Sequence, residues 1–172
     1  MNIFVTGAES TGKSTLSKQL ADYYGVICIE EYARDYIAGL GREYNINDLE
    51  VIGKKQIEQI IQYQDKPLVF FDTGLIITYI WYQQKFKVIP DWLTKAIPVF
   101  GRGRYLLCSN DIPWKSDPLR ENPHKRDELN KLYQSNIKKR GFELEVVGGQ
   151  GEMRLAKSID IVNGWLGLAG NK

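Results

Sequence analysis

The strongest constraint on this chain is the stretch of residues 7–14, which reads G-A-E-S-T-G-K-S. It follows a short apolar run, I-F-V at residues 3–5, and precedes residues 15–21, whose two leucines are spaced as on one helix face. The two glycines permit backbone conformations that a Cβ would obstruct, so successive N–H groups can surround an anionic phosphate at a helix N-terminus. A strand, this loop and a helix in that order predict a binding site for a nucleoside triphosphate.

Within the loop, Lys13 is expected to reach the β- and γ-phosphates of ATP, and the hydroxyl of Ser14 to bind Mg²⁺. A glycine-rich turn, G-G-Q-G at residues 148–151, suits either close approach to a purine base or a flexible connection to the last helix. The residues expected to contact ATP are Gly7, Glu9, Ser10, Thr11, Gly12, Lys13, Ser14, Thr15 and Arg154.

Length and composition are those of one globular domain over residues 1–172, with 43% hydrophobic and 26% charged residues. A net charge of +2 gives no general case for binding nucleic acid or a membrane. No signal peptide is visible and no apolar run approaches the roughly 20 residues that span a bilayer, so a cytoplasmic protein is expected. Cys28 and Cys108 are interpreted as buried thiols in a reducing compartment, and the single His124 excludes a histidine-rich metal site.

Apolar, strand-like runs alternate with helical segments along the chain, which predicts an α/β fold with a parallel sheet covered by helices on both faces. The runs cover residues 2–6, 26–30, 68–71, 105–108 and 144–147. Helices are expected over residues 47–64, with Asn47 as the cap, and over residues 73–86, 90–100, 125–140 and 152–168. Trp81 and Tyr82 on the second of these are expected either to pack in the core or to line a substrate pocket.

Carboxylates follow two of the runs, at the sheet edge where α/β proteins bind ligands. Asp72 ends the third run and is expected to hold Mg²⁺ directly or through water, the alternative being a helix cap. Glu31 is well placed to accept a proton from a hydroxyl nucleophile, and Arg34 to hold the acceptor or orient the base. The alternative for Glu30 and Glu31 is a surface acidic pair that begins a helix.

A long irregular segment follows the fourth run and leads into a charged helix. Residues 110–123 contain three prolines, Trp114 and Arg120, and Arg126 lies just beyond them. A small lid over about residues 110–140 is expected, and its two arginines would reach the transferring phosphoryl group unless they are plain surface charge. A phosphate loop, a metal-binding aspartate and a basic lid all serve phosphoryl transfer, to water in an NTPase or to an organic hydroxyl in a kinase.

Several segments together resemble a specific family. They are G-A-E-S-T-G-K-S-T-L at residues 7–16, E-Y-A-R-D-Y at 31–36, F-D-T at 71–73, and D-I-P-W-K-S-D-P-L-R at 111–120 with Arg126 after it. In this order they are similar to the ribosylnicotinamide kinase domain of NadR-type proteins, and the resemblance covers nearly the whole chain. The segments at 31–36 and 111–120 are far more specific than the phosphate loop.

The resemblance implies a P-loop NTPase fold with a five-stranded parallel sheet of order 2-3-1-4-5. It implies ATP-dependent phosphorylation of the 5′-hydroxyl of nicotinamide riboside, with ATP and Mg²⁺ as cofactors. Lys13 and Ser14 would serve ATP and the metal, Asp72 the metal or the base, and Arg120 and Arg126 the lid. The residues placed at the nucleoside site are Glu31, Tyr32, Arg34, Asp72 and Trp114.

Two departures from the family pattern matter. Family members often carry an adenylyltransferase and a DNA-binding region, for which 172 residues leave no room, so neither NAD synthesis nor repression is expected. Some members have an aromatic residue where this chain has Glu30, so stacking on the base would fall to Tyr32, Tyr63 or Trp81. A kinase for another nucleoside or small alcohol, and a regulatory ATP-binding protein or ATPase, remain as alternatives, and the oligomeric state stays open.

Overall fold

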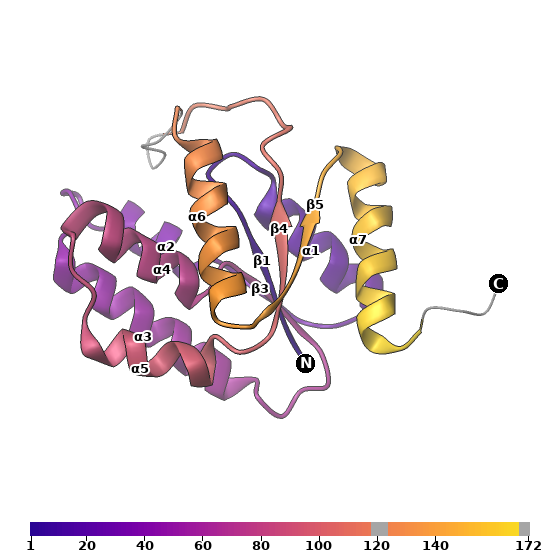
Figure 1. The fold of residues 1–172 in the computed structure, drawn as a ribbon, viewed down its shortest axis with the longest axis horizontal. Helices are drawn as coiled ribbons and strands as arrows, with labels where there is room; N and C mark the ends of the chain where they lie inside the picture. The colour runs from indigo at the N-terminus through magenta and orange to yellow at the C-terminus, as the bar shows by residue number, and fades with distance from the viewer. Residues whose placement is uncertain (118–123, 169–172) are drawn as a thin grey trace.

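A parallel sheet with helices on both faces organises the chain in this computed structural model, which describes residues 1–117 and 124–168 (Figure 1). The sheet has five strands in the order β2-β3-β1-β4-β5, and every pair is parallel. This confirms the α/β, P-loop NTPase-type fold and the strand order implied by the resemblance. The strands are β1 (Asn2–Thr6), β2 (Cys28–Ile29), β3 (Val69–Asp72), β4 (Arg104–Cys108) and β5 (Glu143–Val147).

The helices agree with the predicted segments except at some boundaries. They are α1 (Lys13–Tyr24), α2 (Tyr32–Ala38), α3 (Ile46–Gln62), α4 (Leu75–Trp81), α5 (Asp91–Phe100), α6 (Arg126–Lys139) and α7 (Gly151–Leu166). The continuous helix expected over residues 73–86 is wrong in its second half, because α4 passes into a π-helical turn, η1 (Tyr82–Phe86). Such turns add a residue to a helical turn and so re-aim the side chains that follow.

The cap predicted at Asn47 is wrong by two residues. Asn45 is the N-cap of α3, and its side chain accepts the N–H groups of Asn47 at 2.9 Å and of Asp48 at 3.3 Å. In return, the Asp48 carboxylate accepts the N–H of Asn45 at 2.7 Å, which completes a capping box. Asn47 also has a carboxylate three residues further on, at Glu50, so the capping-box sequence pattern fits both positions.

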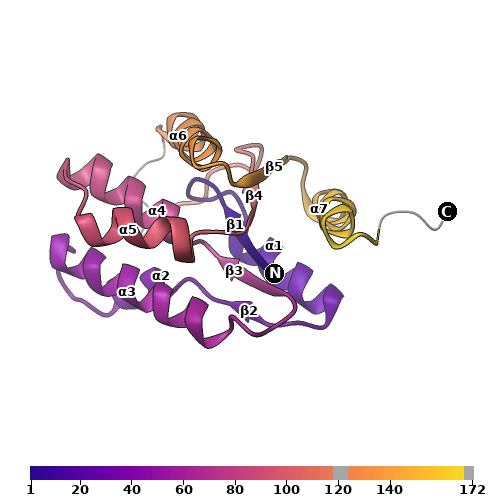
Figure 2. The same ribbon diagram turned by 60° about the horizontal axis from the view of Figure 1, so that its bottom comes forward.

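Alternating residues of the central strands divide the core into two clusters. Phe4 stacks between Phe71 and Tyr105, with ring centroids 5.1 and 5.0 Å apart, on the face covered by α3 to α6. Ile3 and Val5 point to the opposite face, which α1 and α7 cover (Figure 2). Because both faces are buried, the strands read as continuous apolar runs, and this is why they were visible in the sequence.

Parallel strands place their carboxyl ends at one edge, and the predicted site residues follow those ends. The phosphate loop follows β1, which lies between β3 and β4, while Glu31 follows β2 and Asp72 ends β3. This is the edge at which open α/β sheets bind ligands. Both cysteines are free thiols, but only Cys108 is buried, since Cys28 is half-buried.

None of the helices within residues 1–117 and 124–168 is long and apolar enough to cross a membrane.

Candidate active site

The phosphate loop has a backbone conformation that its glycines make possible. Gly7 has φ +144°, and a Cβ there would lie 2.9 Å from the carbonyl oxygen of Cys108. Gly12 has φ +78° and is the N-cap of α1, whose first residue is Lys13. Ser10 also adopts a positive φ, of 57°. The loop therefore wraps into a cradle at the N-terminus of α1, which is the geometry that binds an anionic phosphate.

The lysine of the loop is held inside the cradle by a single peptide. Lys13 Nζ donates to the carbonyl oxygen of Ala8 at 3.0 Å, and the Thr11 hydroxyl donates to the same oxygen at 2.8 Å. Lys13 is half-buried, and its ammonium group contacts this neutral oxygen. An ammonium group held this way is free to turn to a phosphate, for which its attraction is greater.

Asp72 and Ser14 form a polar pair that suits a magnesium ion. Asp72 is 6% exposed at the end of β3, and its Oδ1 atom has no hydrogen-bond partner among the described residues. Burial raises the pKa of the Asp72 carboxyl, against the opposing effects of the Ser14 hydroxyl and the Lys13 ammonium. A buried carboxylate oxygen without a partner calls for a cation or an ordered water. Among the described residues, no three or more His, Cys, Asp or Glu side chains are grouped so that they could hold a metal ion on their own. Mg²⁺ nevertheless needs few protein ligands when substrate phosphates complete its coordination shell.

The backbone immediately after Asp72 is strained. Thr73 has φ +72°, which is unusual for a β-branched residue, and it is 3% exposed. Its N–H donates to the carbonyl oxygen of Val5 at 3.0 Å, which holds it in place. A Cβ on the next residue, Gly74, would lie 2.7 Å from the Phe4 ring. Strain of this kind is concentrated at functional sites, and no local sequence pattern predicted it.

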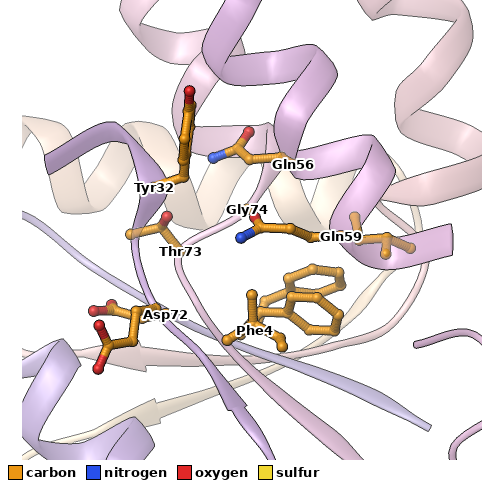
Figure 3. Close-up of a pocket in the computed structure, with 11 residues that line it drawn as sticks. Phe4, Tyr32, Gln56, Gln59, Asp72, Thr73 and Gly74 are labelled. Atoms are coloured by element: carbon orange, nitrogen blue, oxygen red, sulfur yellow. The ribbon is translucent and has the colours of Figure 1, made fainter. Parts of the chain in front are cut away.

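A small cavity adjoins this strained turn and is separate from the main one. It measures about 10 Å³, close to the space that one water occupies, and its lining includes Asp72, Thr73, Gln56 and Gln59 (Figure 3). Tyr32 also lines this small cavity and does not line the larger one. Of the other predicted nucleoside-site residues, Tyr32 thus shares this small cavity with Asp72, but it does not join Glu31 and Arg34 in the larger one.

The main cavity measures about 970 Å³ and joins most of the predicted site. All eight loop residues expected to contact ATP line it, together with Glu31, Arg34 and Asp72. Of the three residues considered for stacking on a base, it is lined by Trp81 and not by Tyr32 or Tyr63. The Trp81 ring lies 5.8 Å from that of Tyr44, which lines the cavity too and which no motif had marked.

Glu31 lies beside the phosphate loop in an environment that disfavours its charge. It is the N-cap residue of α2, half-buried and directed into the main cavity. Burial raises the pKa of the Glu31 carboxyl, Asp72 adds to that increase, and the Lys13 ammonium opposes it. A carboxylate with a raised pKa and access to a cavity is a candidate general base.

Replacing Glu31 with glutamine should therefore stabilise the protein at neutral pH. The raised pKa means that the ionised carboxylate costs more in the folded chain than in the unfolded chain. The gain in melting temperature should be present near neutral pH and should fade as pH falls below about 4, where the unfolded carboxyl is also protonated. Thermal unfolding across this range measures it. Glu30→Gln is the control, since Glu30 is exposed and paired with Lys18 at 2.6 Å, and a destabilised Glu31→Gln at neutral pH would contradict the argument.

Arg126, which was predicted for the lid, is tied to the phosphate loop. It begins α6, and its Nη2 donates to the carbonyl oxygens of Ser10 at 3.1 Å and Ile112 at 2.9 Å. Its Nε atom is buried without a partner among the described residues, and Arg126 is not one of the residues that line the main cavity. Trp114 lies outside the main cavity with its ring centroid 6.0 Å from the Arg126 guanidinium. Arg120, the second predicted lid arginine, lies outside the described residues.

Two further predicted residues make contacts within the protein. Arg34 is exposed on α2 and forms an ion pair with Asp117, so it links α2 to the segment after β4. Arg154 is 3% exposed, and its guanidinium donates to the carbonyl oxygens of Thr11 and Gly149 and pairs with Asp111. Arg154 thus braces the phosphate loop, and its contact with ATP stays a prediction.

Comparison with known proteins agrees with this geometry. A family model described as an AAA domain (AAA_28) matches residues 2–154. The chain belongs to this AAA domain family. The trifunctional NAD biosynthesis/regulator proteins NadR of Salmonella typhimurium and Escherichia coli are each 27% identical to it over 125 residues. That alignment covers 69% of this chain, which spans only 30% of the length of these relatives.

Solved structures show the same fold. The crystal structure of NadR protein in complex with NR superposes with a TM-score of 0.74 at 22% identity, covering 99% of this chain and 51% of that chain. The structure of deoxyadenosine kinase from M. mycoides has a TM-score of 0.67 at 15% identity, covering 95% of this chain and 100% of that chain. These findings confirm the resemblance to NadR-type proteins indicated by the motifs, and a P-loop fold shared with nucleoside kinases.

Proposed function

We propose that this protein is an ATP-dependent kinase that phosphorylates the 5′-hydroxyl of nicotinamide riboside. The observation that carries the proposal is that one cavity of about 970 Å³ is lined by the phosphate loop, by Glu31 and Asp72, and by the aromatic pair Trp81 and Tyr44. These are the parts a kinase needs: a donor site, a group that takes the proton of the attacking hydroxyl, and a surface for the acceptor.

The residues divide the chemical work as follows. Lys13 and the loop N–H groups bind the β- and γ-phosphates, and Arg126, held against the Ser10 carbonyl oxygen, adds positive charge beside the loop. Glu31 or Asp72 accepts the proton of the nucleoside hydroxyl, for which a raised pKa is suitable. Ser14 and Asp72 would hold Mg²⁺, which when bound offsets the negative charge of the phosphates.

The acceptor side suits a cationic base. Nicotinamide riboside carries a positive charge on its pyridinium ring, and aromatic faces and carboxylates attract cations. The Lys85 ammonium already lies 3.5 Å from the centroid of the Tyr44 ring, so we assign the base to the neighbouring ring of Trp81. NadR, a protein of similar fold, has been crystallised in complex with NR. Charge and stacking together therefore support nicotinamide riboside as the acceptor.

Trp81 provides the sharpest mutational test of the acceptor. Trp81→Ala should weaken binding of nicotinamide riboside about tenfold, the typical loss for one base–aromatic stack, while Trp81→Phe should retain most of it. Titration calorimetry measures both, and the KM for ATP should stay within about twofold because the phosphate loop is unchanged. Tyr63→Ala is the matched control, since Tyr63 lies outside the cavity. Equal losses for Trp81→Ala and Tyr63→Ala would contradict the assignment.

One observation favours a second candidate, a kinase for another nucleoside. Glu30 lines the cavity, at the position where some NadR-type proteins have an aromatic residue, and it pairs with Lys18 at 2.6 Å. A carboxylate at that place can accept hydrogen bonds from a neutral base. The same calorimetric titration with adenosine, cytidine, uridine and nicotinamide riboside separates the candidates by the nucleoside that binds most tightly.

A further inference from the structure

We propose that Asn130 is a positioning residue that holds the phosphate loop in its binding conformation and couples it to α6. Asn130 lies on α6, in a charged segment that sequence analysis did not separate from solvated surface. The inference concerns the nucleotide half of the site, and in that respect it rests on the proposed function.

The amide of Asn130 makes three hydrogen bonds. Its Oδ1 accepts the N–H of Ala8 at 2.7 Å. Its Nδ2 donates to the carbonyl oxygen of Cys108 at 2.9 Å and to the Oδ1 of Asn110 at 3.0 Å. The partners fix which way the amide points, because the N–H of Ala8 requires an oxygen and the other two require donors. A planar amide of this length is the group that satisfies all three.

Ala8 is the residue on which the loop depends. Its carbonyl oxygen accepts from both Lys13 Nζ and the Thr11 hydroxyl, and its N–H is held by Asn130. The two peptides that flank Ala8 are therefore both fixed, one by Asn130 and the other by Thr11 and Lys13. If the contact with Asn130 is lost, the Gly7–Ala8 peptide can rotate, the backbone of Ala8 is no longer held from that side, and the lysine that serves the phosphates loses its fixed starting position.

The same helix contacts the loop a second time, one turn earlier. Arg126 and Asn130 are four residues apart and so share one face of α6. Arg126 donates to the carbonyl oxygen of Ser10, and Asn130 accepts from the N–H of Ala8. The first turns of α6 thus form hydrogen bonds to two peptides of the phosphate loop. Because Leu129, Tyr133 and Ile137 anchor α6 in the core, these contacts tie the phosphate loop to a helix that is itself fixed by packing.

Two substitutions and one control test the proposal. Asn130→Ala removes all three hydrogen bonds, and Asn130→Asp keeps the size and the acceptor for Ala8 but sets carboxylate oxygens against two acceptors. Asn136→Ala is the control, since Asn136 lies on the same helix and its amide donates to the carbonyl oxygen of Leu132 at 2.9 Å and accepts from Arg140 at 2.9 Å, both outside the phosphate loop. Titration calorimetry with ATP and hydrogen exchange of the loop amides are measured on all of them.

We expect Asn130→Ala to weaken ATP binding about tenfold, with a smaller change in the KM of the acceptor, and Asn130→Asp to weaken it further through repulsion of the phosphates. The amide of Ala8 should exchange at least tenfold faster in Asn130→Ala, with or without ATP, and Asn136→Ala should match the wild type in both measurements. ATP affinity and Ala8 exchange within twofold of wild type in Asn130→Ala would overturn the inference. If Asn130→Ala does not fold, Asn130→Asp decides by the same criteria. A wild-type protein that binds no ATP refutes the proposed function instead, and Ala8 exchange still tests the role of Asn130.

Discussion

Replacing Lys13 with alanine is expected to reduce phosphoryl transfer by about 10²- to 10³-fold while the protein stays folded. The reason is that its ammonium group is the loop cation expected at the β- and γ-phosphates. Within the protein, this group donates to a neutral carbonyl oxygen, that of Ala8. Losing that contact costs little stability, since the Thr11 hydroxyl still donates to the same oxygen. ATP consumption and thermal unfolding, measured on the same preparation, give the two halves of the result.

Lys18→Ala is the matched control for this substitution. Lys18 lines the same cavity from α1, but it is exposed and pairs with Glu30. Exposed pairs of this kind contribute about 1 kcal/mol or less, so this variant should keep near-normal turnover. Wild-type turnover in the Lys13→Ala protein would contradict the role given to the phosphate loop in phosphoryl transfer.

Replacing Asp72 with asparagine is expected to lower turnover by about 10²- to 10⁴-fold and to raise the Mg²⁺ concentration needed for half-maximal activity. The buried Oδ1 of Asp72 has no partner among the described residues and lies beside Ser14, which is where a cation would be held. Because burial raises the pKa of Asp72, its charge costs free energy in the folded protein at neutral pH. Asp72→Asn should therefore melt at the same temperature as wild type or higher, near neutral pH.

A control substitution and a comparison with Glu31→Gln distinguish the roles of Asp72 and Glu31. Asp22→Asn, on the exposed face of α1, should change neither turnover nor the Mg²⁺ requirement. If Asp72→Asn shifts the Mg²⁺ requirement while Glu31→Gln removes the acidic limb of the pH–rate profile, Glu31 is the base and Asp72 the metal residue. Normal turnover of Asp72→Asn at low Mg²⁺ would contradict both roles given to Asp72.

The elements of this fold were predictable from the sequence because the central strands of the parallel sheet are buried on both faces. Those strands therefore appear as apolar runs, whereas β2 is much shorter than its run and the edge strand β5 is largely exposed and carries two glutamates. The order of the strands could not be derived from the runs, because it depends on crossovers between distant segments, and it came from the resemblance. The cap of α3 could not be decided from the sequence, since Asn45 has Asp48 and Asn47 has Glu50 three residues later.

The site was predictable where a motif carries its own geometry. The loop residues, Glu31 and Asp72 line one cavity because each follows the end of a parallel strand. Contacts between distant residues could not be predicted: Arg154, expected to contact ATP, donates to Thr11, and Asn130, which no motif marked, accepts from Ala8, each more than a hundred residues away along the chain. Helical periodicity could not show which aromatic residue would stack on a base, since Trp81 both packs against the core and lines the cavity. Only the fold brings Tyr44 to its ring.

The central claim is that this cavity transfers a phosphoryl group from ATP to the hydroxyl of a nucleoside. It is tested most directly by incubating the wild-type protein with ATP, Mg²⁺ and one nucleoside at a time, and identifying the product by mass and by phosphorus NMR. We expect ADP to appear only when an acceptor is present, and nicotinamide riboside to yield its 5′-phosphate faster than adenosine, cytidine or uridine. Turnover confined to another nucleoside would contradict the acceptor assignment, and ATP binding without acceptor-dependent turnover would contradict the kinase itself.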